Sequence, residues 1–134
     1  MTISPSLLGS PLGNDFSIGS SDGYLSADEI ANYLSRALTS VDIKGKKVTL
    51  IIPDSTRSCP IGLILSHLYR AWADEVQSLT ALIALGTHAA MTEEEIDKFI
   101  FKGASTAKAE FPKMPIINHE WWKPETFLNI GEIS

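Results

Sequence analysis

The chain has 134 residues, enough for one domain with a hydrophobic core, and its 44% hydrophobic and 20% charged residues are an ordinary globular composition. The formal net charge of −5, without a basic cluster, argues against nucleic acid as a partner, because phosphate binding needs concentrated Lys and Arg. The sequence has a single cysteine, no apolar run near the roughly 18 residues of a membrane span, and no signal-peptide pattern. These features predict a cytoplasmic protein that does not enter a membrane.

A helix and a strand are the first predicted elements. Residues 1–25 are rich in Gly, Ser and Pro, so we expect an extended or loosely ordered lead-in. Ser26 and Glu29 fit a capping box, in which each side chain pairs with a free backbone N–H, and apolar residues then recur at helical spacing. After Gly45, "KKVTLIIPD" predicts a strand that ends near Pro53, and its mostly apolar run is typical of a strand covered on both faces.

Two further pairs of a helix and a strand follow. Pro60 is expected in the first turn of a second helix, whose apolar stripe ends at Trp72. The segment "SLTALIALG" predicts a second strand, which Gly86 stops. Thr92 and Glu95 fit a second capping box at the start of a third helix, and "MPIINHEWW" predicts a third strand that runs into a loop.

The alternation of helices and strands indicates the fold class. It implies a parallel sheet with right-handed crossovers and helices on its faces, that is, a Rossmann-like three-layer α/β domain with a mainly parallel sheet. We expect this domain to span residues 26–134, and no internal repeat or low-complexity block interrupts it.

Three predicted loops leave the same edge of this sheet, because parallel strands share the edge at which they end. Ligands of open α/β sheets bind in the crevice there. The loops are "PDSTRSCP", "GTHAAMT" and "NHEWW", and we expect them to bring an acid, an arginine and a histidine together. The candidates are Asp54, Thr56 and Arg57 in the first loop, Thr87 and His88 in the second, and Asn118 and His119 in the third.

Each candidate also has a structural interpretation. Asp54 either caps the turn that follows it or belongs to a site, and Arg57 either pairs with a surface acid or holds a carboxylate or phosphate with its planar fork. A helix N-terminus near Pro60 would favour an anion at the same loop. His88 is either a solvent-exposed loop residue or a proton carrier, a role that suits histidine near neutral pH. Cys59 is expected to be a packing residue.

Motifs of several other activities are missing from the sequence. It has no P-loop and no G-x-G-x-x-G. The acids of "TEEE" are explained as a favourable first turn of a helix, and the histidines and nearby acids have no recognised metal-ligand spacing. The residues by themselves therefore indicate an α/β domain with an anion-binding edge and a candidate general base, and we assign no metal ligand.

Two of the loops resemble the lactate racemase family that uses a nickel-pincer nucleotide cofactor. "PDSTRSCP" matches that family's D-x-T-R-x-x-P loop, and "ALGTHAAMTEEE" contains its G-x-H-x-x-(M or S)-(T or S)-x-x-E segment. The tail "NHEWWKPETFLNIGEIS" is similar to the family's "NHDW…LGxI" segment. The resemblance covers roughly residues 26–134, and the two motifs together are more specific than either one.

This resemblance implies a racemase or epimerase of 2-hydroxy acids. In the family a hydride leaves Cα for the pyridinium ring of the cofactor and returns to either face of the planar keto acid, while a histidine removes the hydroxyl proton. His88 matches one of two proton-transfer histidines, Arg57 the arginine that holds the substrate carboxylate, and Asp54 the aspartate that orients the site. Thr56 and Asp54 are the expected cofactor contacts.

The chain also departs from the family. Family members are several-fold longer, and their second domain supplies the lysine that holds the cofactor, the histidine that ligates nickel and the other proton-transfer histidine. The resemblance therefore implies the N-terminal domain of a larger two-domain enzyme, inactive alone, whose partner is its own C-terminal domain. Two alternatives stay open: a stand-alone module that binds a carboxylate or phosphate, and a subunit of a split enzyme.

Overall fold

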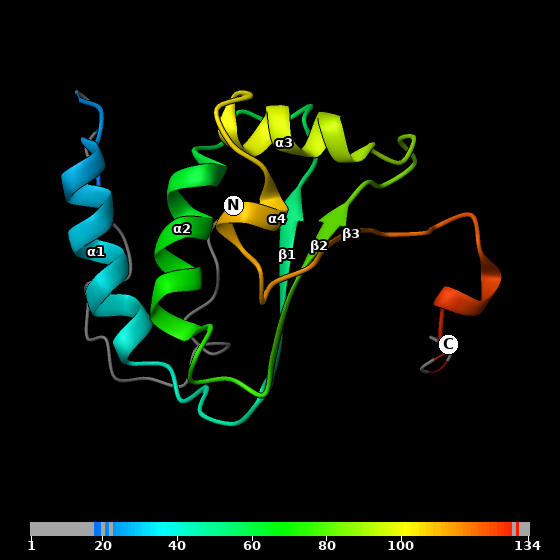
Figure 1. Cartoon of the computed structure of the whole chain (residues 1–134), viewed down its shortest axis with the longest axis horizontal. Helices are drawn as coiled ribbons and strands as arrows, with labels where there is room; N and C mark the ends of the chain where they lie inside the picture. The colour runs from blue at the N-terminus through cyan, green and yellow to red at the C-terminus, as the bar shows by residue number, and fades with distance from the viewer. Residues whose placement is uncertain (1–17, 20, 22, 130, 132–134) are drawn as a thin grey trace. The chain divides into compact units, whose positions relative to one another are not determined.

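Helices and strands alternate along the chain (Figure 1). The structure is a computed structural model that describes residues 18–19, 21, 23–129 and 131, so most of the lead-in predicted for residues 1–25 lies outside the described residues. In chain order the elements are α1 (Ala27–Thr39), β1 (Lys47–Pro53), α2 (Ile61–Trp72), β2 (Ser78–Ala84), α3 (Glu93–Phe101), α4 (Ala107–Glu110), β3 (Ile116–Asn118) and the 3-10 helix η2 (Pro124–Thr126).

Three parallel strands form one open sheet in the order β1-β2-β3. In its pairing with β3, the strand β2 places Ala81 opposite Ile116 and Ile83 opposite Asn118. Together with the flanking helices, this sheet confirms the predicted Rossmann-like α/β class. Because the strands are parallel, their carboxyl ends lie at one edge, which is where the candidate loops begin.

The chain divides into two compact units. The first comprises the residues up to Val48 together with Pro60–Leu79, and the second comprises Thr49–Cys59 together with the residues from Thr80 onward. The loops after β1, β2 and β3 all belong to the second unit.

In the first unit, α1 and α2 pack against each other. The predicted capping box of α1 is confirmed: the Ser26 N–H donates to Glu29 Oε2 at 2.8 Å, and the Glu29 N–H donates to Ser26 Oγ at 3.2 Å. The indole N–H of the buried Trp72 in α2 donates to the Leu38 carbonyl of α1 at 3.2 Å. This bond satisfies a buried indole donor and ties the two helices together.

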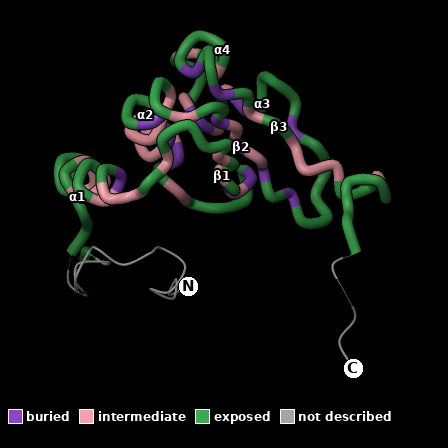
Figure 2. The backbone as a smooth tube through the Cα atoms, turned by 90° about the horizontal axis from the view of Figure 1, so that it is seen from below, coloured by how far each residue is buried: buried purple, intermediate pink, exposed green. Residues whose placement is uncertain are grey.

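In the second unit, the predicted capping box of α3 is also confirmed, with Thr92 and Glu95 pairing with each other's backbone N–H groups. The helix ends at Lys102, which adopts the left-handed conformation at φ 54°. Figure 2 shows how buried segments recur along this part of the chain. Its buried apolar residues are Ile52, Ala81, Ile83, Leu85, Met91, Ile96, Ile100, Phe111 and Met114.

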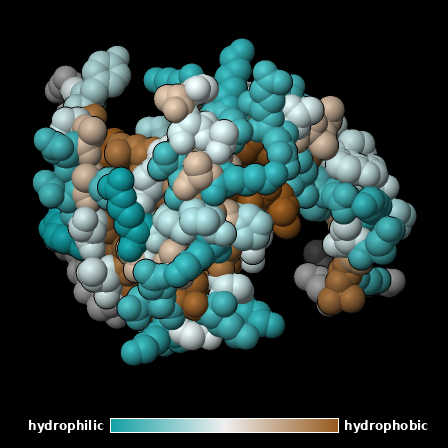
Figure 3. All heavy atoms as spheres, viewed as in Figure 1, coloured by the Kyte–Doolittle hydropathy of each residue, from teal (hydrophilic) through white to brown (hydrophobic). Residues whose placement is uncertain are grey.

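The prediction that the first strand is covered on both faces is wrong for the part of the chain that the structure describes. Ile52 is 5% exposed, whereas its neighbour Ile51 is 75% exposed. Successive side chains of a strand point to opposite faces, so one face of β1 is buried and the other meets solvent. Ile117 of β3 is exposed as well. On the face drawn in Figure 3, apolar surface is exposed in separate areas between polar side chains.

The third strand is shorter than the segment "MPIINHEWW" that predicts it, since β3 covers only Ile116–Asn118. Pro115 has no N–H to add to a ladder, although its carbonyl accepts from the Ala81 N–H at 2.9 Å. Beyond the strand, the His119 N–H donates to the Ile83 carbonyl at 3.1 Å, and the chain then turns at Trp121 and Trp122. This short strand places its last residue, Asn118, beside the end of β2.

Candidate active site

Asp54 follows directly after β1 and organises its own loop. Its Oδ1 accepts from the Thr56 N–H at 3.1 Å and from the Thr56 hydroxyl at 2.6 Å. Its carbonyl accepts from the Arg57 N–H at 3.3 Å. The structural interpretation of Asp54 as a turn-capping residue therefore holds, but it uses only one of the two carboxylate oxygens.

The second carboxylate oxygen of Asp54 meets His88. After β2 the chain turns at Gly86, which adopts φ +61°, a backbone conformation that is strained for residues with a side chain. The turn is closed by the His88 N–H, which donates to the Leu85 carbonyl at 3.0 Å. The imidazole Nδ1 of His88 then lies 2.5 Å from Asp54 Oδ2. The Asp54 side chain is 7% exposed, whereas the His88 side chain is 56% exposed. One partner is thus fixed in the protein and the other meets solvent.

The environment of Asp54 lowers its pKa from 3.8 to about 2. The hydrogen bond from the Thr56 hydroxyl is the largest cause, the bond to His88 is the next, and burial opposes both. At neutral pH Asp54 is therefore ionised and can only accept hydrogen bonds. The hydrogen between the two side chains must then belong to Nδ1 of His88.

This assignment fixes which nitrogen of His88 can act as a base. A neutral imidazole carries one N–H and one lone pair, so a hydrogen on Nδ1 leaves the lone pair on Nε2. A carboxylate at Nδ1 also stabilises the imidazolium that forms when Nε2 takes a proton. The pair of Asp54 and His88 therefore has the chemistry of a general base that is held by an aspartate.

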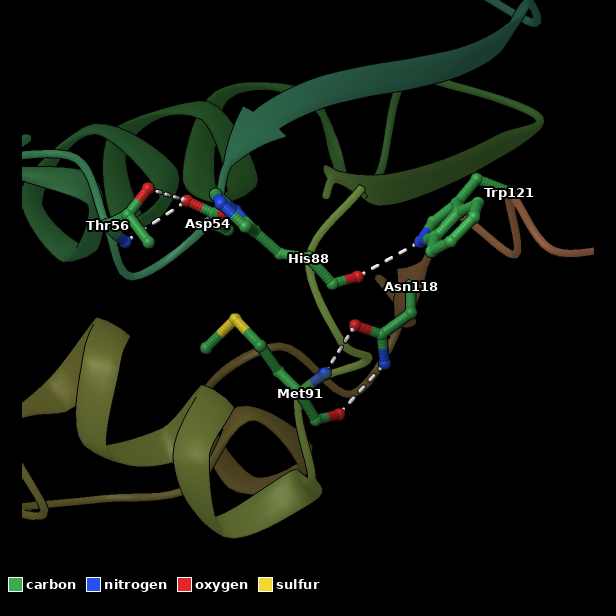
Figure 4. A network of polar contacts seen from close by, with 6 residues as sticks. All are labelled: Asp54, Thr56, His88, Met91, Asn118 and Trp121. Atoms are coloured by element: carbon green, nitrogen blue, oxygen red, sulfur yellow. Dashed lines mark hydrogen bonds and ion pairs between the residues drawn. The ribbon is translucent and has the colours of Figure 1, made fainter. Parts of the chain in front are cut away.

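The end of β3 holds the loop that carries His88 (Figure 4). Asn118 Oδ1 accepts from the Met91 N–H at 3.0 Å, and Asn118 Nδ2 donates to the Met91 carbonyl at 2.9 Å. The indole N–H of Trp121 donates to the carbonyl of His88 at 3.0 Å. Asn118 was expected at this edge of the sheet, but no role was predicted for it. Trp121 was not among the predicted site residues, because a hydrogen bond to a distant backbone group leaves no pattern in the sequence.

The other predicted site residues are placed as follows. Arg57 is exposed, and its side chain has no hydrogen bond or ion pair to any residue that the structure describes, so its guanidinium is available to an anion. His119 contacts Phe127 edge to face, with ring centroids 5.5 Å apart. Cys59 is a half-buried free thiol. The structure thus brings Asp54 into direct contact with both Thr56 and His88, and it leaves Arg57 three residues from Asp54 on the same loop.

The described residues form no cluster of protein ligands around a metal ion. Among them no group of three or more His, Cys, Asp or Glu side chains is arranged to hold a metal. Asp54 is already engaged through both carboxylate oxygens, by Thr56 and by His88. We therefore assign no nickel ligand among the described residues. Within the described ranges, no helix combines the length and the apolar character needed to cross a membrane.

The parallel sheet and the loop residues define an α/β domain with an aspartate–histidine pair at the edge where the strands end. Residues 28–134 match the family model described as the lactate racemase N-terminal domain, and the chain belongs to this family. A crystal structure of a Thermotoga maritima protein is similar over 75% of this chain, with 30% sequence identity and a TM-score of 0.61. The match spans only 23% of that protein's chain. No curated protein matched the sequence significantly.

Proposed function

We propose that this chain is the N-terminal domain of a 2-hydroxy acid racemase or epimerase that works by hydride transfer to a nickel-pincer nucleotide. The observation that carries the proposal is the bond between His88 Nδ1 and the ionised Asp54, which leaves His88 Nε2 as a base. Membership of the lactate racemase N-terminal domain family supports the same class of reaction.

In this proposal Arg57 binds the substrate carboxylate. Its guanidinium has no described partner, and its planar fork matches the two oxygens of a carboxylate. Binding at the carboxylate fixes the direction of the Cα–H and Cα–OH bonds relative to the loop. Loss of this contact would weaken substrate binding and misplace the reacting atoms.

His88 takes the proton of the substrate hydroxyl on Nε2 while the C–O bond gains carbonyl character. Asp54 stabilises the resulting imidazolium through Nδ1–H, and Thr56 keeps Asp54 ionised and oriented. Reversal of the proton transfer gives back the hydroxyl. When bound, the nickel-pincer nucleotide would supply the hydride acceptor and donor, and no described residue of this chain is assigned to its metal. Thr56 and Asp54 remain the predicted contacts of the cofactor.

The proposal requires further polypeptide. With its side chain 56% exposed, His88 lacks the exclusion of water that hydride chemistry needs. Apolar side chains beyond the end of β3 are also exposed, among them Trp122, Phe127 and Leu128. A second domain of a longer chain, or a separate subunit, would cover such a surface. We therefore expect the chain to be inactive alone.

A stand-alone binding module is the second candidate, favoured by the unpartnered guanidinium of Arg57. The deciding experiment adds L-lactate or inorganic phosphate to the purified chain and follows backbone NMR shifts, with Arg57→Ala as the test variant and Arg70→Ala as a matched exposed control. The binding module would be favoured if Arg57→Ala abolishes binding and if a longer protein that contains this chain and is loaded with cofactor shows no racemisation. Racemisation that His88→Gln and Arg57→Ala abolish would establish the enzyme.

A further inference from the structure

Two sets of hydrogen bonds join the end of β3 to the loop between β2 and α3. Asn118 engages both backbone groups of Met91, and the indole N–H of Trp121 engages the backbone carbonyl of His88 itself. All of these residues lie in the second unit of the chain. Figure 4 shows them reaching the loop from the β3 side, while Asp54 and Thr56 approach His88 from the β1 side.

The His88 loop has little else to hold it. Leu85 and Met91 are buried at its two ends, but Gly86 and residues 87–90 are exposed. Exposed loop residues lack packing that would fix their backbone, and a base must be held to within a fraction of an ångström to work. The bonds from Asn118 and Trp121 supply fixed points at the buried end of this loop and at His88 itself.

The chemistry of each bond suits this task. A primary amide offers one acceptor and two donors, so Asn118 pairs with the N–H and the carbonyl of one residue, as a neighbouring strand would. Trp121 donates through a rigid indole, whose N–H can point in one direction only. Met91 also directly precedes Thr92, the N-cap of α3, so the loop is anchored to the start of a helix.

We propose that Asn118 and Trp121 are positioning residues, which fix the backbone of the His88 loop so that the imidazole reaches Asp54. This inference rests on the proposed role of His88 as the base. It assigns to the end of β3 a task in the reaction, although neither side chain touches the substrate.

The first test measures the pKa of the Asp54 carboxyl by 13C NMR in the 134-residue chain. Trp121→Phe keeps the aromatic ring and removes the donor, Asn118→Ala removes both bonds to Met91, and Trp122→Phe is the matched control. In both test variants the pKa of Asp54 should rise above about 2, because the hydrogen bond from His88 that helps to lower it is weakened. The rise should be no larger than in His88→Ala, because the hydrogen bond from Thr56 still lowers the pKa. Trp122→Phe should match the wild type.

The outcomes separate this inference from the proposed function. If Asn118→Ala fails to fold by circular dichroism, Trp121→Phe decides. A folded Trp121→Phe with an unchanged Asp54 pKa would overturn the positioning role, whatever the enzyme does. In a longer protein that contains this chain, Trp121→Phe should lower kcat with little change in KM. If Trp121→Phe changes the pKa of Asp54 but leaves kcat unchanged, the positioning role of Trp121 is supported and the role of His88 as the base is refuted.

Discussion

The imidazole Nδ1 of His88 lies 2.5 Å from Oδ2 of Asp54, although the two residues are 34 positions apart in the sequence. The other oxygen of the same carboxylate is held by Thr56. One buried acid therefore organises its own loop and orients the histidine of the next loop. This arrangement assigns the lone pair of a neutral His88 to Nε2, and the predictions below follow from it or from the fold that supports it.

Thr56→Val should raise the pKa of Asp54 from about 2 toward 3.8. The Thr56 hydroxyl bond is the largest cause of the lowered pKa, and valine keeps the shape while removing the donor. The bond to His88 should keep the value below 3.8. Carbon-13 NMR of the carboxyl group measures it, with Ser55→Ala as the control on the same loop. An Asp54 pKa that stays near 2 in Thr56→Val would show that the hydroxyl bond does not set it.

Asp54→Asn should change the pH dependence of stability. Since the pKa of Asp54 falls on folding, its carboxylate stabilises the fold fully above about pH 4 and loses this contribution as the pH drops toward 2. The difference in unfolding free energy between wild type and Asp54→Asn should therefore shrink across that interval. Urea unfolding at several pH values measures it, and Glu94→Gln is the control. A difference that stays constant from pH 4 to pH 2 would contradict the lowered pKa.

In a longer protein that contains this chain, His88→Gln should lower kcat by roughly 10²–10⁴-fold, the usual range for the loss of a general base. KM should change little, because substrate binding is assigned to Arg57.

Arg57→Lys should instead raise KM, since an ammonium cannot form the paired bonds of a guanidinium with a carboxylate. Steady-state racemisation measures both variants. Equal effects of the two substitutions on kcat and on KM would contradict these separate roles.

The open face of β1 gives a prediction about stability. Ile83→Ala removes a fully buried side chain and should cost roughly 2–5 kcal/mol of unfolding free energy. Ile51→Ala removes a side chain that is 75% exposed and should cost less than about 1 kcal/mol, which is the range of β-propensity. Denaturant unfolding of the two variants compares them directly. Similar losses would mean that Ile51 is buried in solution, for instance in a dimer, which a sedimentation measurement would reveal.

Local features were the most predictable from the sequence. The capping boxes at Ser26 and Thr92 depend on residues three positions apart, and both form as expected. The parallel topology led us to expect an acid, an arginine and a histidine at one edge of the sheet, and Asp54 and His88 meet there, but the direct bond between these two side chains was not predicted. Which nitrogen of His88 faces the acid could not be predicted, since that depends on side-chain geometry.

Long-range features were less predictable. An apolar run such as "KKVTLIIPD" has the same pattern whether one or both faces of the strand are covered, so the exposure of Ile51 left no signal. The bonds from Asn118 to Met91 and from Trp121 to His88 link side chains to backbone groups that any residue could provide. Only the three-dimensional arrangement of the loops reveals them.

The role of His88 as the base is tested most directly by its tautomer in the 134-residue chain, measured by nitrogen-15 NMR at a pH where the imidazole is neutral. We expect a hydrogen on Nδ1 and a bare Nε2 in the wild-type protein, and we expect this preference to be lost in Asp54→Ala. A hydrogen on Nε2 of the wild-type protein would contradict the central claim, because Nε2 would then have no lone pair with which to take the proton of a substrate hydroxyl.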